Sequence, residues 1–251
     1  MAIITLTTDF GTRDGYVGAV KGVLARRAHE PVLVDLAHDI PPGDVAHAAW
    51  VVATSANEFP YGTIHLVVVD PGVGGLRRGV IISSAGQWYV GPDNGVFAYV
   101  ADRRSTAWAI ESPQLLGSAS RTFHGRDVFA PIAASLSRGE DAQTWGPATQ
   151  LTGELPWGAR PEREGRVVHV DRFGNLITDL PRAEAGTAVT IAGRTFAIVG
   201  TYEDVASGEL LAYIGSAKTV EIAVRDGRAD RILEAPRGTP VRPGGAAGPY
   251  R

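Results

Sequence analysis

The feature that most constrains the fold is a series of short apolar runs separated by helical patterns. Three of these runs, residues 3–8, 31–37 and 62–70, are rich in β-branched residues and carry no regular polar face. Between them, residues 15–28 and 43–59 place apolar side chains at helical spacing. Strands that are apolar throughout and alternate with helices are typical of a parallel sheet covered on both faces. The chain is therefore predicted to begin with an α/β domain.

The middle of the chain predicts further elements and then a linker. Residues 79–101 indicate a hairpin-like pair of strands, followed by a Pro-Asp-Asn-Gly turn and the start of a helix. Residues 127–139 indicate one more helix. The stretch 151–165 is rich in proline and glycine and has no sustained periodicity, which is typical of a linker.

The C-terminal part has the pattern of antiparallel β structure. Apolar and polar residues alternate there, with turn signals about every ten positions, and residues 229–235 are counted among these strands. The tail, residues 237–251, has too little apolar content to pack, so we expect it to be mobile. The predicted fold is a mostly parallel sheet flanked by helices over residues 1–150 and a smaller, antiparallel, barrel-like β domain over residues 166–251.

Composition narrows the classes of function. The chain has 24 basic and 27 acidic residues, a net charge of −3, and no basic block of the kind that nucleic-acid binding needs. It has no cysteine, which excludes disulfides, thiolate metal sites and a cysteine nucleophile. The stretch MAIITLTTDFG does not have the pattern of a basic, apolar leader, and no run approaches the ~18 apolar residues of a membrane span. We expect a cytoplasmic protein that acts on a small molecule, without membrane or nucleic-acid partners.

Two aspartates stand where predicted strands end. In open α/β sheets, ligands bind outside the carboxyl ends of the strands, and Asp9 and Asp70 both follow such ends. Asp-Phe-Gly and Asp-Pro-Gly are also good turns, so a purely local role is the alternative for each. For Asp70, the glycines that follow would let backbone approach a ligand, and Arg77 lies just beyond them.

Two other motifs carry polar groups. His124 lies in TFHGRD, just before a predicted helix, and would be a surface residue if nothing else converged on it. Folded against Asp70 and Arg77, it would complete a carboxylate, guanidinium and imidazole set able to hold and polarise a water. Asp171, Phe173 and Asn175 could give a stacking face and amide hydrogen bonds to a planar heterocycle, or simply an irregular hairpin with Asx-turn chemistry.

These motifs also occur together in one known family. The stretches LTTDFGTRDGYVGAVKGV, HDIPPGDVAHAA, FPYGTIHLVVVDPGVGG, GPDNGVF, TFHGRDVFAP and DRFGNLIT stand in family order between residues 6 and 178, and VEIAV follows at 220–224. The chain thereby resembles the S-adenosylmethionine hydroxide adenosyltransferases, relatives of the bacterial fluorinase and chlorinase. A long, ordered set of motifs is far more specific than any single one.

The resemblance implies cleavage of S-adenosylmethionine to adenosine and L-methionine, by attack of a water-derived hydroxide on the ribose 5′ carbon. The family's catalytic set falls on Asp70, Arg77 and His124, which the halogenating relatives do not keep. S-adenosylmethionine would then be the substrate, and the resemblance implies neither a cofactor nor a metal. Family members are homotrimers whose sites lie between the N-terminal domain of one subunit and the C-terminal domain of the next.

The resemblance also places the residues that bind the substrate. Asp9 is expected at the ribose hydroxyls. Phe173 and Asn175 would hold adenine, or Asp171 and Asn175 the methionine end. Two further substrate-binding residues, Ser216 and Glu221, are expected in the C-terminal domain.

The sequence departs from the family pattern at two glycines. Gly75 stands where a threonine is usual, and Gly215 where an asparagine is common.

Three other functions are alternatives to hydrolysis. The nearest is that of a halogenase that makes 5′-halo-5′-deoxyadenosine. Another is a metal-dependent hydrolase, and the last is a non-catalytic module that binds adenosine or S-adenosylmethionine. The ligands of the metal site would be Asp9, Asp70, His124 and Asp127.

Overall fold

The computed structural model describes residues 2–244. The chain divides into two compact units, residues 1–156 and residues 157–251. The stretch expected to be a linker is shared between them, with residues 151–156 in the first unit and residues 157–165 in the second.

The first unit is built on a seven-stranded, mostly parallel sheet with the strand order β2-β1-β3-β5-β4-β6-β7. Strands β2, β1, β3 and β5 run parallel, whereas β4, β6 and β7 pair antiparallel at one edge. The strands are β1 (Ile3–Thr8), β2 (Val32–Ala37), β3 (Ile64–Val68), β4 (Gly79–Ser84), β5 (Gln87–Pro92), β6 (Thr106–Ala109) and β7 (Ala148–Thr149).

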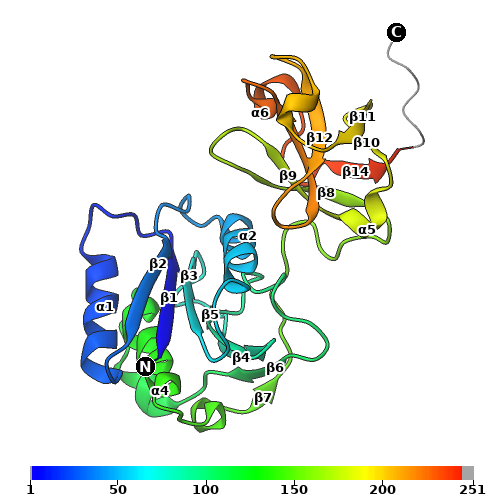
Figure 1. The fold of residues 1–251 in the computed structure, drawn as a ribbon. Helices are drawn as coiled ribbons and strands as arrows, with labels where there is room; N and C mark the ends of the chain where they lie inside the picture. Colours follow the sequence, from blue (N-terminus) through cyan, green and yellow to red (C-terminus); the bar gives the residue numbers. More distant parts are fainter. Residues whose placement is uncertain (1, 245–251) are drawn as a thin grey trace. The chain divides into compact units, whose positions relative to one another are not determined.

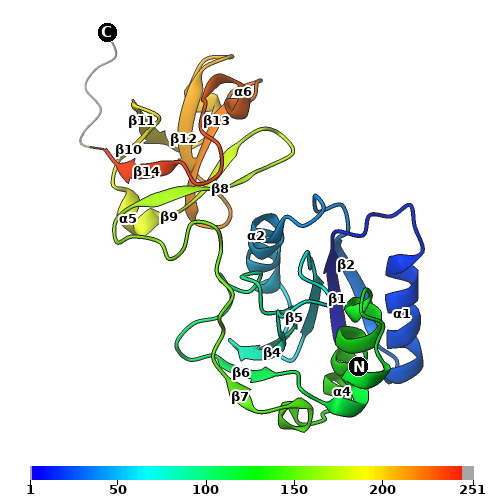
Figure 2. The same ribbon diagram turned by 180° about the vertical axis from the view of Figure 1, so that it is seen from behind.

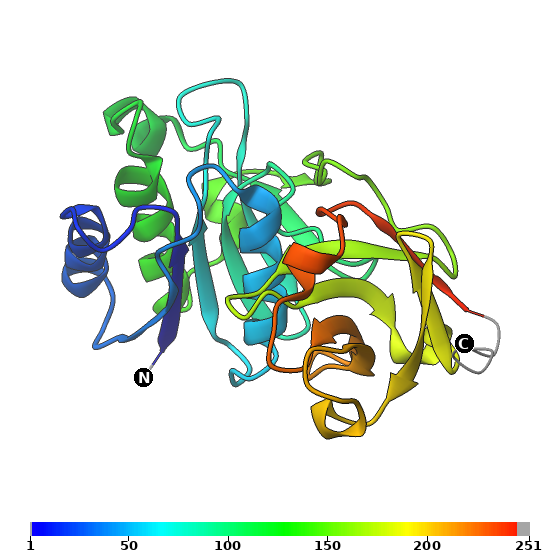
Figure 3. The same ribbon diagram turned by 90° about the horizontal axis from the view of Figure 1, so that it is seen from above.

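Helices cover both faces of this sheet, as the apolar strands predict. Alternate residues of β3 divide between two cores: Ile64 and Leu66 pack with α1 and α4, and Val67 packs with α2. Figures 1 and 2 show α1 and α4 together on one face, and Figure 3 shows the sheet between them and α2. The helices are α1 (Tyr16–Arg27), α2 (Val45–Ala56), α3 (Pro113–Ser118), the π-helical turn η1 (Gly125–Phe129), α4 (Ala130–Ser137) and the 3₁₀ turn η2 (Ala142–Trp145).

The helix predicted after the Pro-Asp-Asn-Gly turn is absent, because residues 94–101 form a series of turns. Gly95 has φ +98°, and a Cβ there would lie 2.6 Å from the carbonyl oxygen of Glu154. The backbone therefore leaves the helical region at the position where the helix would begin.

The second unit is a closed barrel with the strand order β10-β11-β12-β13-β9-β8-β14. All pairs are antiparallel except β11 with β12. In Figures 1 and 2, α5 and α6 lie at opposite ends of the barrel. The elements are β8 (Gly165–Val170), β9 (Leu176–Pro181), α5 (Arg182–Ala185), β10 (Ala188–Ile191), β11 (Arg194–Val199), the 3₁₀ turn η3 (Tyr202–Asp204), β12 (Leu210–Ile214), β13 (Thr219–Val224), α6 (Ala229–Ile232) and β14 (Pro240–Pro243).

Two predictions for this unit were wrong. Residues 229–235 begin with helix α6 rather than forming a strand. Part of the tail that was expected to be mobile forms β14, which pairs with β10 and β8 and buries Val241 completely. A single apolar side chain is enough there because the strand closes the barrel between two partners. Residues 245–251, the rest of that tail, lie outside the described residues.

None of the helices within residues 2–244 combines the length and the apolar character that crossing a membrane requires.

Candidate active site

Four loops meet at the carboxyl ends of the parallel strands. The Asp9 carboxylate, after β1, accepts the backbone N–H of Gly43 at 2.8 Å. A Cβ on Gly43 would lie 3.6 Å from Cβ of Pro71, in the loop after β3. A Cβ on Gly74 would lie 2.3 Å from the carbonyl oxygen of Arg121, so only glycine lets these two loops touch.

Asp70 and Arg77 form a bidentate ion pair within the loop after β3. Arg77 Nε donates to Asp70 Oδ1 at 2.8 Å and to Oδ2 at 3.0 Å, and Arg77 Nη2 also donates to Oδ2. The two side chains are only 5% and 12% exposed, for Asp70 and Arg77 respectively. The guanidinium carbon lies 5.4 Å from the centre of the Phe129 ring. This fork geometry fixes both the position and the plane of the guanidinium.

His124 completes the group from a different loop. Its Nδ1 lies 2.8 Å from Arg77 Nη2. Because a guanidinium has only donors, Nδ1 must accept, and the proton of the neutral ring is on Nε2. Burial, and then the charge of Arg77, lower the pKa of His124 from its usual value of 6.5. The ring is therefore neutral at pH 7 and offers an N–H at Nε2. The three predicted residues are brought together.

Asp127 is not part of this group. Its carboxylate is held by the Arg126 guanidinium at 2.6 Å and by the backbone N–H of Ser120 at 2.9 Å. Within residues 2–244, no three His, Cys, Asp or Glu side chains gather so as to hold a metal ion. The residues named for the metal-hydrolase alternative therefore do not form a ligand set.

Aromatic side chains that the sequence reasoning did not single out hold Asp9 and His124 in neighbouring loops. The ring of Phe10, next to Asp9, lies 5.8 Å from the ring of Phe123, next to His124, and Tyr16 packs edge-on against Phe123 at 5.4 Å. The sequence could have indicated this contact, because Phe10 adjoins Asp9 in Asp-Phe-Gly and Phe123 adjoins His124 in TFHGRD.

In the second unit, Asp171 is engaged by its own loop. Its Oδ1 accepts the backbone N–H groups of Phe173 and Asn175, each at 2.9 Å, and its Oδ2 accepts Asn175 Nδ2 at 2.8 Å. This is the Asx-type arrangement that was the structural alternative for the motif. The loop leaves Phe173 72% exposed and Asn175 buried. Asp171 shapes the loop, and Phe173 is its accessible part.

Glu221 and Ser216 lie near each other but differ in setting. Glu221 is on β13, is buried, and accepts the Tyr213 hydroxyl at 2.5 Å. Burial raises the pKa of Glu221; the Tyr213 hydrogen bond opposes this, and the charge of Asp171 adds to it. Ser216 is exposed in the turn between β12 and β13.

The glycine beside Ser216 has a structural reason. A Cβ at Gly215 would lie 1.8 Å from Glu221 Oε1, so the Glu221 carboxylate fills the space that a side chain at position 215 would need. The observed position of Glu221 therefore requires a glycine at position 215, where the family commonly has asparagine.

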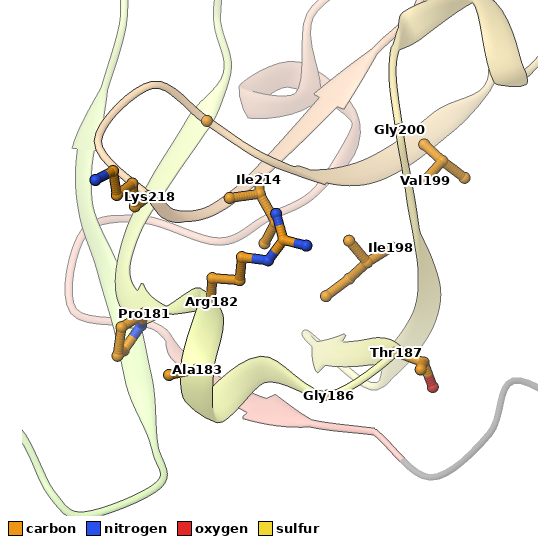
Figure 4. A pocket seen from close by; sticks show the side chains of 11 residues that line it. Pro181, Arg182, Ala183, Gly186, Thr187, Ile198, Val199, Gly200, Ile214 and Lys218 are labelled. Atoms are coloured by element: carbon orange, nitrogen blue, oxygen red, sulfur yellow. The ribbon is translucent and has the colours of Figure 1, made fainter.

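A separate hollow of about 1110 Å³ opens in the second unit. Figure 4 shows Arg182 reaching from the start of α5 between Ile198 and Ile214. None of the residues predicted to bind substrate lines it. The lining is Pro181, Arg182, Ala183, Gly186, Thr187, Ile198, Val199, Gly200, Ile214, Gly215 and Lys218.

The fold and the site together define a class: an α/β unit with an Asp-Arg-His group at its strand ends, followed by a closed β-barrel unit. Comparison with known proteins gives the family. Residues 4–146 match the SAM hydroxide adenosyltransferase N-terminal domain, and residues 165–242 match the corresponding C-terminal domain. The chain belongs to this family.

Individual relatives agree with this assignment. The (R)-S-adenosyl-L-methionine hydrolase of Thermus thermophilus is 42% identical, over 96% of this chain and 99% of the relative. A crystal structure of an uncharacterized conserved protein from Thermotoga maritima superposes with a TM-score of 0.83 at 33% identity, covering 95% of this chain and 98% of that one. The fluorinase of Nocardia brasiliensis is more distant, at 25% identity over 72% of each chain.

Proposed function

We propose that this chain hydrolyses S-adenosyl-L-methionine to adenosine and L-methionine. The observation that carries the proposal is the Arg77 guanidinium, bonded both to the Asp70 carboxylate and to His124 Nδ1, in a chain of this family. Relatives named (R)-S-adenosyl-L-methionine hydrolase, at 38–42% identity over nearly the whole chain, support it.

The chemistry is limited by the nucleophile and not by the leaving group. The sulfonium departs as a neutral thioether, so its departure needs neither a general acid nor a metal. The oxygen–C5′ bond forms as the C5′–sulfur bond breaks and its electron pair passes to sulfur. The attacking water gives up one proton to bulk water. In-line positioning of the water can supply up to ~7–11 kcal/mol of the barrier reduction in favourable cases.

The site residues favour hydroxide over water at the attacking position. Free water is a very weak acid, and a positive charge and hydrogen-bond donors next to it lower its pKa. Arg77 provides the charge and His124 Nε2–H the donor. His124 is poorly suited to accept the proton, because its Nδ1 lone pair is engaged by Arg77. We therefore assign His124 as a donor that holds the nucleophile, with Asp70 orienting Arg77.

Substrate binding uses groups that remain available. The Oδ2 atom of Asp9 is engaged by Gly43, whereas its Oδ1 accepts no hydrogen bond within residues 2–244 and is free for a ribose hydroxyl. The exposed Phe173 ring would stack on adenine, with Asn175 beside it. We assign Asp171 to holding this loop, while Ser216 and Glu221 remain candidate substrate contacts.

Assembly and location are also proposals. From the family resemblance we propose a homotrimer with sites built by neighbouring subunits, no cofactor other than the substrate itself, and a cytoplasmic location.

The direct test is chromatography of a reaction of the purified chain with S-adenosylmethionine. We expect adenosine and methionine in equal amounts, with the same rate in EDTA and no 5′-chloro product in chloride. A chloride-dependent 5′-chloro product would replace the proposal with halogenation. Binding of nucleoside without any product under single-turnover conditions would replace it with a binding module.

A further inference from the structure

The turn at Asp93 and Asn94 forms hydrogen bonds with both ends of the loop that carries Asp70 and Arg77. Asn94 Nδ2 donates to the carbonyl of Val69, immediately before Asp70, at 2.9 Å. The backbone N–H of Asp93 donates to the carbonyl of Arg78, immediately after Arg77, at 2.9 Å. The turn belongs to the GPDNGVF motif, for which the proposed chemistry has no role.

Hydrogen bonds of the Arg78 and Asp93 side chains further stabilise the C-terminal end of the loop. Arg78 Nη2 donates to Asp93 Oδ2 at 2.8 Å, and Arg78 Nη1 donates to Thr149 Oγ1 at 2.8 Å. The Asp93 carboxylate also accepts the backbone N–H groups of Thr152 and Gly153, at 3.1 and 2.9 Å. Burial works to raise the pKa of Asp93, but these hydrogen bonds outweigh it and hold the pKa below its usual value. Asp93 is thus a charged, fully engaged anchor.

Apart from the Asp70–Arg77 ion pair, the loop has few internal contacts to keep its shape. Its backbone makes two turn hydrogen bonds, Val73 N–H to Asp70 O at 3.2 Å and Gly75 N–H to Gly72 O at 3.0 Å. The side chain of Leu76, next to Arg77, is fully exposed. Three glycines within seven residues give the free loop many conformations. The ion pair with Asp70 fixes the guanidinium within the loop. The anchored ends hold the loop in place on the sheet, and so help to set where Arg77 lies relative to His124.

We propose that Asn94 and Asp93 are positioning residues for the reaction, which hold the two ends of the 70–77 loop so that the Arg77 guanidinium meets His124. They touch no reacting atom and act through Val69 and Arg78. This inference rests on the proposed function for its effect on rate, but its geometric part can be measured without any reaction.

The test compares Asn94→Ala with Thr63→Val. Thr63 is buried at the opposite end of β3, and its hydroxyl donates to the Pro60 carbonyl at 2.8 Å, so Thr63→Val also removes one side-chain bond to a carbonyl. We expect Asn94→Ala to lower kcat about 10-fold or more, with KM for S-adenosylmethionine within about 3-fold, because small displacements of a catalytic group reduce rates steeply. Thr63→Val should change neither.

The second readout is titration of the His124 ring followed by nitrogen NMR in the full chain. The charges acting on this ring are those of Arg77, Asp70 and Asp127, and Arg77 lowers its pKa. In Asn94→Ala the guanidinium moves away, so the pKa of His124 should rise, whereas Thr63→Val should leave it unchanged. This holds whatever reaction the site performs, so failure of the inference is distinct from failure of the proposed function.

An unchanged His124 titration and kcat in a folded Asn94→Ala protein would overturn the inference, as would the same changes in Thr63→Val. If Asn94→Ala does not fold, Asp93→Asn preserves volume and most acceptor geometry while weakening the Arg78 contact. It should move kcat and the His124 titration in the same direction, and no change in either would count equally against the inference.

Discussion

The two polar clusters of the molecule are held together in different ways. Arg77 and His124, joined by a hydrogen bond, are 47 positions apart and meet only because four loops converge on the sheet. Asp171 and Asn175 are four positions apart and satisfy each other within one loop. The first cluster is half-buried and fixed in orientation by tertiary structure, whereas the second is a self-contained loop that presents an exposed ring. This difference suggests chemistry in the first and substrate contact in the second, so variants should separate into effects on kcat and effects on KM.

The largest effect is expected for the guanidinium. Arg77→Lys keeps a positive charge but loses the fork that binds Asp70 and His124 together. We expect turnover to fall by ~10² or more, with KM for S-adenosylmethionine little changed, and a similar fall in His124→Ala. Steady-state assay of product measures both. Arg103→Ala, at an exposed arginine of the same unit, is the matched control. Undiminished turnover in both Arg77→Lys and His124→Ala would show that the first cluster does not perform the chemistry.

The pH dependence follows from the state of His124. The pKa of its ring is lowered in the folded chain, and protonation at Nδ1 would break the contact with Arg77. Protonation of His124 should therefore leave activity unaffected around pH 7 and reduce it as the pH drops through the lowered pKa, below 6.5, by about tenfold per unit. A kcat/KM profile between pH 4.5 and 8 checks this. An acid limb centred above 6.5 would mean that the ring is not held neutral as described.

A smaller effect, on binding, is expected for the exposed loop. Asp171→Ala removes the acceptor of three hydrogen bonds and frees Phe173 and Asn175. We expect KM to rise by ~10-fold to ~10²-fold while kcat stays within about 3-fold. Three lost bonds at about 1 kcal/mol each total about 3 kcal/mol, and substrate binding must supply part of this to re-order the loop. Glu162→Ala, at an exposed acidic residue of the same unit, should change neither constant. A large loss of kcat in Asp171→Ala would erase the distinction between the two clusters.

The smallest effect is expected at Gly75, where the family usually has threonine. A Cβ there meets only the carbonyl oxygen of Gly72, at 3.1 Å, so a small adjustment accommodates it. Gly75→Thr should leave kcat/KM within about 3-fold. Gly74→Ala is the sharp contrast, because Gly74 has φ +74° and its Cβ would collide with the Arg121 carbonyl. Equal activity of the two variants would show that the contact between these loops does not matter.

What the sequence could and could not predict follows the same division between local and distant contacts. The parallel strands were predictable because their apolar character and the helices between them are local patterns. The helix after the Pro-Asp-Asn-Gly turn was predicted wrongly, because contact of Gly95 with the distant Glu154 backbone decides the conformation there. Strand β14 was missed because its partners, β10 and β8, are far away in the sequence.

For the candidate site, single residues were easier to find than their partners. Asp70, Arg77 and His124 could be named from strand ends and family motifs, but the tautomer of His124 depends on which atom of Arg77 it meets. The two adjacent arginines also have different partners, because Arg77 binds Asp70 and Arg78 binds Asp93. Their spacing in the sequence does not show this difference. Asp171 was a candidate for the methionine end of the substrate, which stays a prediction, and its three bonds within the loop show a structural use that the sequence left open.

The central claim is that Asp70, Arg77 and His124 direct a water to the ribose 5′ carbon. Running the reaction in ¹⁸O-labelled water tests it most directly. Mass spectrometry should find one ¹⁸O atom in adenosine, at the 5′ oxygen, and none in methionine. Adenosine without the label, or label in methionine, would contradict the account.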